Sequence, residues 1–209
     1  MQFPTRGLYL VTPDADDSGA LIASVAPLLA HVVCLQYRNK RACPGVRDDE
    51  ARTLRDMAAH AGVCFIVNDD ARLAREVGAD GVHLGEDDGE IATWRRELGR
   101  DFIIGASCYD DAARARIAVA SGADYVAFGA LFASTTKPGA RRATPGLFAD
   151  TRDLGVPRVA IGGITPDNAA SLVGAGADLL AVISSVYDAA DPVAAARTYS
   201  SFYETASRP

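Results

Sequence analysis

Eight short apolar segments recur along the 209-residue chain, each followed by a longer segment of helical period, and this alternation limits the possible folds more than any other feature. The segments are nearly continuous in apolarity, which is typical of parallel strands buried on both faces. Strands are therefore expected at Gly7–Thr12, Val32–Tyr37, Val63–Val67, Gly81–Leu84, Phe102–Ala106, Tyr125–Phe128, Arg158–Ile161 and Leu179–Ile183.

The segments between these strands carry apolar residues at three- and four-residue spacing, as amphipathic helices do. Helices are expected at Leu21–Leu29, Asp49–Ala61, Ala71–Val77, Ile91–Leu98, Asp111–Ser121, Pro145–Leu154, Asp167–Gly174 and Val193–Tyr203. Eight strand–helix units without a hairpin signal predict an α/β fold, a single (β/α)₈ TIM barrel over residues 1–209. A doubly wound open sheet is the alternative.

Three phrases, VGADGVHLG, SGADYVAFG and AGADLLAVIS, share a Gly-Ala-Asp step that leads into a predicted strand. Glycine ends a helix, the Ala-Asp pair makes the turn, and the strand begins. This echo indicates a repeated architecture. Further along the chain, Thr165 or Asp167 is expected to cap the helix that follows the seventh strand, with Pro166 in its first turn.

The formal net charge of −6 argues against nucleic acid or an anionic membrane as a partner. No apolar stretch reaches membrane-spanning length, and the N-terminal segment shows no targeting pattern. The four cysteines form no CxxC pair, and Cys34 and Cys64 lie in apolar runs where burial is expected. These features predict a cytoplasmic protein and leave open whether it forms a homo-oligomer. Its expected ligands, phosphorylated small molecules, follow from the residues at the strand ends.

Barrel enzymes place their active sites at the carboxyl ends of the strands, so the residues that follow each strand are the candidates. After the second strand, Gln36, Arg38 and Lys40 alternate along the chain and are expected on one side of it. Arginine and lysine at a barrel rim suggest an anion site. The alternative is a solvated basic loop.

Acidic clusters follow the third and fourth strands, at Asn68–Asp70 and Glu86–Asp88. Neighbouring strands bring them to the same rim, where hard oxygen ligands beside cations suit Mg²⁺ on a diphosphate. The alternative is that Asp69 or Asp70 caps the next helix and that the second cluster is a solvated turn. One cap and one ligand can coexist in a cluster.

Small polar residues and glycines follow the later strands. Ser107 follows the fifth strand, and a polar loop over Leu131–Thr144 follows the sixth. Gly162–Gly163 and Ile183–Ser185 stand where barrels commonly form a phosphate cradle, with ordinary tight turns as the alternative. His83 and Trp94 are expected to be packing residues, and no nucleophilic triad is apparent.

Several phrases together resemble the thiamine-phosphate synthase family: YLVT, LQYRNK, FIVNDD, GADGVHLGEDD, TTK, AIGGI and AVISS, in this order from Tyr9 to Ser185. The resemblance implies an enzyme that joins a hydroxymethylpyrimidine diphosphate to a thiazole phosphate, giving thiamine monophosphate and diphosphate. It also implies a dissociative substitution assisted by Mg²⁺. Diphosphate leaves, a pyrimidine-methyl cation forms, and the thiazole nitrogen captures it.

The resemblance also assigns roles to residues. It gives Arg38, Lys40 and Lys137 as the catalytic cations and Asp69 and Asp88 as the metal ligands. It gives the substrate-binding residues as Gln36, Arg38, Lys40, Asn68, Ser107, Ser134, Thr136, Lys137, Gly163, Ile183 and Ser184.

The sequence departs from the family pattern at Glu86, Tyr109, Ala130 and Ala133, which concerns ligand contacts and loop rigidity. Two other functions are compatible with the barrel: a thiazole tautomerase and a non-catalytic sensor of phosphorylated ligands. Because the diphosphate-binding residues are complete, the synthase is favoured.

Overall fold

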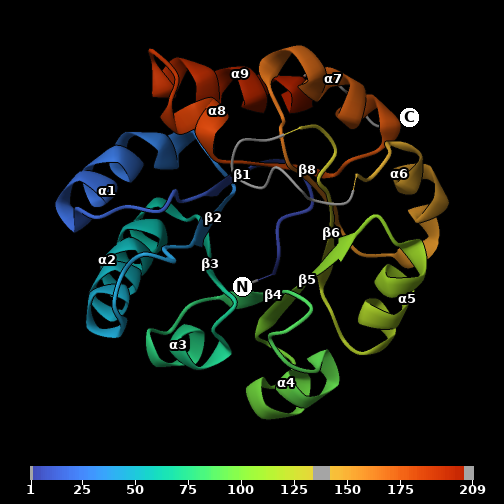
Figure 1. The fold of residues 1–209 in the computed structure, drawn as a ribbon, viewed down its shortest axis with the longest axis horizontal. Helices are drawn as coiled ribbons and strands as arrows, with labels where there is room; N and C mark the ends of the chain where they lie inside the picture. The colour runs from blue at the N-terminus through green and yellow to red at the C-terminus, as the bar shows by residue number, and fades with distance from the viewer. Residues whose placement is uncertain (1, 134–141, 205–209) are drawn as a thin grey trace.

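Each apolar segment of the sequence forms a strand in the computed structural model, which describes residues 2–133 and 142–204. The strands are β1 Gly7–Val11, β2 Cys34–Tyr37, β3 Cys64–Asn68, β4 Gly81–Leu84, β5 Ile103–Tyr109, β6 Tyr125–Phe128, β7 Arg158–Ile161 and β8 Leu179–Val182. All neighbours pair in parallel, and β8 pairs with β1 to close the barrel (Figure 1). The (β/α)₈ barrel is confirmed, and the open sheet is wrong.

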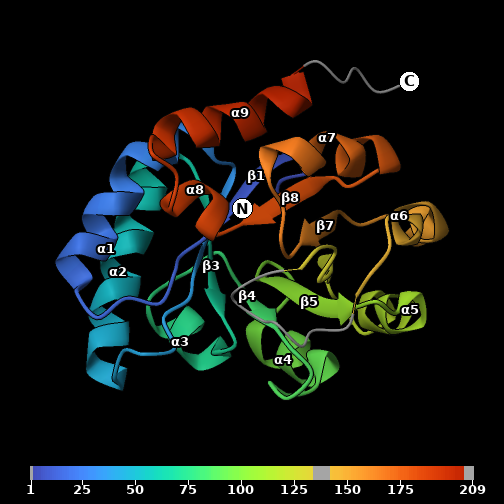
Figure 2. The same ribbon diagram turned by 45° about the horizontal axis from the view of Figure 1, so that its top comes forward.

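The helices surround the barrel (Figure 1). They are α1 Ser18–Val25, α2 Pro44–Ala61, α3 Ala71–Glu76, α4 Ile91–Leu98, α5 Ala112–Ala120, α6 Gly146–Asp150, α7 Pro166–Ala175, α8 Ser184–Tyr187 and α9 Pro192–Glu204. Two 3₁₀ segments, Ala26–His31 and Arg152–Leu154, follow α1 and α6. Figure 2 shows α9 lying across the outside of the barrel beside α1 and α7.

The predicted boundaries differ from the observed ones for physical reasons. The expected helix Leu21–Leu29 ends at Val25, because Pro27 lacks the N–H that would continue it. Strand β5 runs on to Tyr109, where polar residues hide the apolar pattern. The four-residue helix α8 was not predicted, since it is too short to show a helical period.

Two apolar layers hold the fold. One fills the inside of the barrel and the other lies between the strands and the helices. Cys34 and Cys64 are buried in the inner layer, as predicted. Phe3 enters the barrel and stacks on the ring of Tyr125, with 3.8 Å between ring centroids. The N-terminal segment therefore lies within the ring of strands, as Figure 1 shows.

The repeated Gly-Ala-Asp motif has a structural role. The carboxylate of Asp80, just before β4, accepts a hydrogen bond of 2.9 Å from the backbone N–H of Phe65 in β3. Asp124 binds the N–H of Ile104 in β5 in the same way, at 2.7 Å. Asp178 repeats the contact at 2.9 Å with the N–H of Arg158 in β7. The repeated aspartate thus forms a side-chain hydrogen bond between the residue before β4, β6 or β8 and the backbone of the preceding strand, β3, β5 or β7.

The cap of α7 is Thr165, which forms a capping box with Asn168. In the part of the chain that the structure describes, no helix is both long and apolar enough to cross a membrane.

Candidate active site

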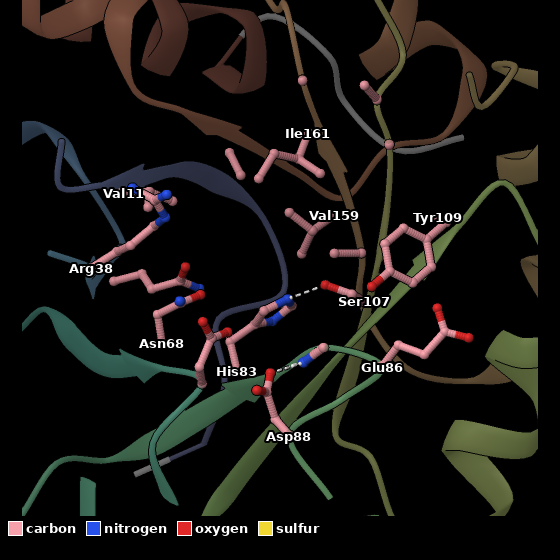
Figure 3. A pocket seen from close by; sticks show the side chains of 18 of the residues that line it. Val11, Arg38, Asn68, His83, Glu86, Asp88, Ser107, Tyr109, Val159 and Ile161 are labelled. Carbon is pink, nitrogen blue, oxygen red and sulfur yellow. Dashed lines mark hydrogen bonds between the residues drawn. The ribbon is translucent and has the colours of Figure 1, made fainter. Parts of the chain in front are cut away.

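A pocket of about 340 Å³ opens at the carboxyl ends of the strands and receives side chains from all eight. Seven residues selected from the sequence line it: Gln36, Arg38, Lys40, Asn68, Asp69, Asp88 and Ser107. Figure 3 shows Arg38, Asn68 and Asp88 along one side, with Val159 and Ile161 across from them. The structure therefore brings the residues of β2 to β5 into one site, as expected from their places in the sequence.

The basic side chains after β2 are held by aspartates. Arg38 pairs with Asp14 at 2.9 Å, and the Lys40 ammonium pairs with Asp69 at 2.9 Å. The backbone N–H of Lys40 also donates to Asp14, at 2.7 Å. Arg38 and Lys40 are therefore paired with aspartates at the rim, where the Lys40 side chain is about half exposed.

Asp14 follows β1 and was not among the candidates. Burial by itself would raise the pKa of its carboxyl. The hydrogen bond from the Lys40 backbone and the guanidinium of Arg38 outweigh that effect, so the pKa is lowered. The sequence could have identified Asp14 from its position, since it follows a barrel strand as the other rim residues do.

Two acidic residues after β3 have different roles, a helix cap and a pocket residue, as the sequence allowed. Asp70 caps α3 by accepting a hydrogen bond of 2.9 Å from the backbone N–H of Leu73. Asp69 lines the pocket instead. Burial tends to raise the pKa of Asp69, but the hydrogen bond and charge of Lys40 lower it.

Asp88 reaches the pocket from the cluster after β4, and its carboxylate accepts a hydrogen bond of 2.7 Å from the Gly85 backbone N–H (Figure 3). Its pKa is raised, first by burial and then by the neighbouring Asp69 charge, while the Gly85 N–H acts in the opposite direction. The indole of Trp94 donates to the Asp88 carbonyl at 2.9 Å, so this packing residue also supports the loop.

The adjacent carboxylates of Asp69 and Asp88 fit a divalent cation. Two like charges in contact are unfavourable, and a cation between them relieves the repulsion. Among residues 2–133 and 142–204, no group of three or more His, Cys, Asp or Glu side chains forms a metal-binding cluster. Mg²⁺ needs no such cluster, because it is commonly held by one or two carboxylates together with substrate phosphates and water.

Backbone strain is concentrated at this pocket. Within the described ranges, the non-glycine residues with positive φ are Asp69, at 63°, and Tyr109, at 52°, and both line the pocket. Aspartate tolerates this conformation, whereas an aromatic residue there is an outlier. Such strain persists where the surrounding structure imposes it, and it clusters at functional sites.

Tyr109 and Glu86, two of the departures from the family pattern, are joined through Arg114. The Arg114 guanidinium lies 5.4 Å from the centre of the Tyr109 ring and 3.4 Å from the Glu86 carboxylate. Its Nε also donates to the Ser107 carbonyl, at 2.9 Å. The two unusual residues therefore belong to one cluster beside Ser107.

His83 is buried and packed, as expected, but it also lines the pocket. Its ring nitrogens lie 3.0 Å from the Tyr125 hydroxyl and 2.9 Å from the Ser107 hydroxyl. Val82 and Leu84 belong to the layer under the helices, so alternation turns His83 inward. That alternation was the signal by which the sequence could have identified it.

The glycines after β7 permit a close contact between two segments. A Cβ on Gly162 would lie 2.7 Å from Ala130, and one on Gly163 would lie 2.5 Å from the Ala133 carbonyl oxygen. The Phe132 N–H donates to the Gly162 carbonyl at 3.0 Å. The pair is therefore required where the segment after β6 passes against the segment after β7.

Of the predicted residues after β7 and β8, only one lies in the pocket wall. Gly162 lines the pocket, whereas Gly163, Ile183 and Ser184 follow β7 and β8 outside the set of lining residues. Ile183 stands at the N-cap of α8. Ser134, Thr136 and Lys137 lie outside the described residues.

The sequence matches a family model described as thiamine monophosphate synthase over residues 8–186. It is 58% identical over 194 residues to the thiamine-phosphate synthase of Xanthomonas campestris pv. campestris strain 8004, covering 93% of this chain and 94% of that protein. It is 59% identical over 200 residues to the thiamine-phosphate synthase of Azoarcus sp. strain BH72, covering 95% and 97%.

The fold is similar to that of a solved structure, thiamine phosphate pyrophosphorylase from Pyrococcus furiosus. The TM-score is 0.85, the sequence identity is 31%, and 96% of each chain is covered. The sequence comparison and this structural comparison therefore both find proteins of thiamine phosphate formation.

Proposed function

The chain belongs to the thiamine monophosphate synthase family and is an enzyme of thiamine biosynthesis, and we propose which residues of its pocket bind the substrates and which stabilise the leaving group. The substrates are a hydroxymethylpyrimidine diphosphate and a thiazole phosphate. The observation that carries the proposal is the grouping of Arg38, Lys40, Asp69 and Asp88 on one side of a single pocket.

Arg38 and Lys40 bind the diphosphate of the pyrimidine substrate. Their present partners are Asp14 and Asp69, at 2.9 Å in both pairs. A diphosphate offers more negative charge than a single carboxylate, and arginine can bind it through two parallel hydrogen bonds. Lys137, in the segment that follows β6, would add a third cation.

Asp69 and Asp88 would hold Mg²⁺, with Asn68 beside them in the pocket wall. When bound, the ion supplies positive charge that stabilises the departing diphosphate. Lys40 then serves both the Asp69 carboxylate and the substrate, since its side chain is about half exposed at the rim.

The reaction needs charge stabilisation and positioning rather than a protein nucleophile. Arg38 and Lys40 stabilise the leaving group as the bond to the pyrimidine methylene breaks. Val159 and Ile161 offer an apolar wall that excludes water from the cationic carbon until the thiazole nitrogen captures it. This account agrees with the lack of a recognisable nucleophilic triad in the sequence.

The phosphate of the thiazole substrate would bind beyond this wall, at Gly163, Ile183 and Ser184, with Ser134 and Thr136 from the loop. Strands β7 and β8 are neighbours in the barrel, so their ends form one anion-binding region.

The unpaired state of all four cysteines supports a reducing compartment such as the cytoplasm.

The test is a coupling assay with both substrates, with and without Mg²⁺. Thiamine monophosphate and diphosphate formed in a metal-dependent manner would support the proposal. Isomerised thiazole without coupling would point to a tautomerase, and saturable binding without turnover would point to a sensor. Either of these two outcomes contradicts the proposal.

A further inference from the structure

A continuous line of hydrogen bonds crosses the floor of the pocket. Gln36 Nε2 donates to the Tyr9 hydroxyl at 2.6 Å, and the Tyr9 and Tyr125 hydroxyls lie 2.8 Å apart. The Tyr125 hydroxyl is 3.0 Å from His83 Nδ1, and His83 Nε2 is 2.9 Å from the Ser107 hydroxyl. The line joins β2 to β5 through side chains of β1, β6 and β4.

Tyr125 is the central member of this line, and it lies beneath the pocket. The other members, Tyr9, Gln36, His83 and Ser107, line the pocket, whereas Tyr125 is fully buried and does not. A Cβ on Gly105 would fall 2.0 Å from the Tyr125 ring, so the glycine makes room for it. Phe3 stacks on the same ring, with 3.8 Å between ring centroids. Tyr125 can therefore influence a ligand only through its neighbours.

The sequence of donors and acceptors gives the line of hydrogen bonds a direction. Burial, above all other effects, raises the pKa values of the Tyr9 and Tyr125 phenols well above the ordinary value, so each keeps its single proton. Tyr9 accepts a hydrogen bond from the Gln36 amide, so its own O–H is directed to the Tyr125 hydroxyl. With the Tyr125 proton directed to Nδ1 of His83, 3.0 Å away, the proton of a neutral ring would lie on Nε2.

The two ends of the line consequently present fixed groups to the pocket. His83 Nε2–H donates to the Ser107 oxygen, so the Ser107 proton is available to a ligand. One N–H of the Gln36 amide donates to Tyr9, which fixes the orientation of the amide and leaves its carbonyl oxygen available as an acceptor. Such chains also polarise one another, which strengthens each bond.

We propose that Tyr125 is a positioning residue that fixes His83 in its Nε2–H form and so presents one acceptor, on Gln36, and one donor, on Ser107. This inference rests on the proposed function and specifies how its pyrimidine is recognised. An aminopyrimidine offers the complementary pattern, because its amine donates to the Gln36 carbonyl and a ring nitrogen accepts from the Ser107 hydroxyl.

The first test uses Tyr125→Phe, which removes only the hydroxyl and keeps the ring stacked on Phe3. The KM for the pyrimidine diphosphate should rise about tenfold, as expected for a lost buried hydrogen bond, while the KM for the thiazole phosphate changes by less than about twofold. Tyr37→Phe is the matched control, since its buried hydroxyl bonds Glu50 at 2.7 Å on the helix side of β2. It should lose stability without a change in either KM.

The second test is independent of activity. The chain has three histidines, so ¹⁵N-histidine spectra of the resting protein can be assigned with single substitutions. His83 should carry its proton on Nε2 in the wild type, and Tyr125→Phe should convert it to a mixture of tautomers. The Tyr37→Phe spectrum should match the wild type.

Three results would overturn the inference: a proton on Nδ1 of His83 in the wild type, an unchanged His83 spectrum in Tyr125→Phe, or equal effects of Tyr125→Phe on both KM values. If the wild type does not couple the substrates, the proposed function fails, and the histidine spectrum alone then decides whether Tyr125 sets the tautomer.

Discussion

The two halves of the pocket differ in what holds them in place. The half formed after β2, β3 and β4 is charged and partly open, and its Lys40 side chain is 54% exposed. The half formed by β7 and β8 is apolar and continuous with the barrel interior, where Val159 is fully buried. Exposed ion pairs contribute little to stability, whereas buried apolar side chains contribute much.

This difference separates function from folding. The charged half can be changed at a large cost to the reaction and a small cost to the fold, while substitutions in the apolar half should lower stability and leave the metal dependence of the rate unchanged. Substitutions on the two sides can therefore test whether the division is real.

Asp88→Ala should have the largest effect. Losing one of two carboxylates for the metal should reduce kcat by about 100-fold or more, as the loss of an electrostatic group at a reacting centre does. The melting temperature should change little, because Asp88 lies at the rim. Rates measured over a range of Mg²⁺ concentrations check this; an unaltered Mg²⁺ dependence would remove Asp88 from the metal site.

Arg38→Ala should weaken binding of the pyrimidine diphosphate by about 10- to 100-fold, the usual cost of a hydrogen bond between charged groups. Affinity for the thiazole phosphate should stay the same, which provides the internal control. Binding calorimetry with each substrate alone gives both values. Equal weakening of the two substrates would contradict the division of the pocket.

Val159→Ala is the counterpart in the apolar half. Removing buried methyl groups should lower the free energy of unfolding by about 1–2 kcal/mol. The Mg²⁺ dependence of the rate should remain that of the wild type. Denaturant unfolding and the metal titration measure the two quantities, and a changed metal dependence with normal stability would reverse the assignment.

Asp14→Asn should have the smallest effect, and one that depends on pH. The folded-state pKa of Asp14 lies below its unfolded value of 3.8, so its contribution to stability is present above that value and is lost as the pH falls through the folded pKa. The variant should therefore melt at a lower temperature than the wild type at about pH 7, with the difference shrinking in acid as the pH falls through the lowered folded-state pKa. A difference that persists in acid would mean that Asp14 does not act through its charge.

The barrel could be predicted because its signal is repeated. Eight apolar segments with helices between them leave few alternatives, and each strand confirms the period of the others. The predicted boundaries were wrong where residues interrupt a pattern, as Pro27 does in the first helical segment and the polar residues do at the end of β5.

The charged half of the site was predicted for a similar reason, since polar residues after apolar strands stand out. The floor of the pocket was not. Tyr9, His83 and Tyr125 lie within strands and look like core residues, and their hydrogen bonds span 24 to 116 positions in the sequence. Such contacts depend on the closure of the barrel, which no local pattern describes.

Binding of inorganic pyrophosphate tests the central claim most directly, because it isolates the charged half from the rest of the reaction. Calorimetry on the wild type should show tight binding with Mg²⁺ and weak binding without it. Asp88→Asn should abolish this metal enhancement, and Val159→Ala should retain it. Equal binding with and without Mg²⁺, or an enhancement that survives in Asp88→Asn, would contradict the account.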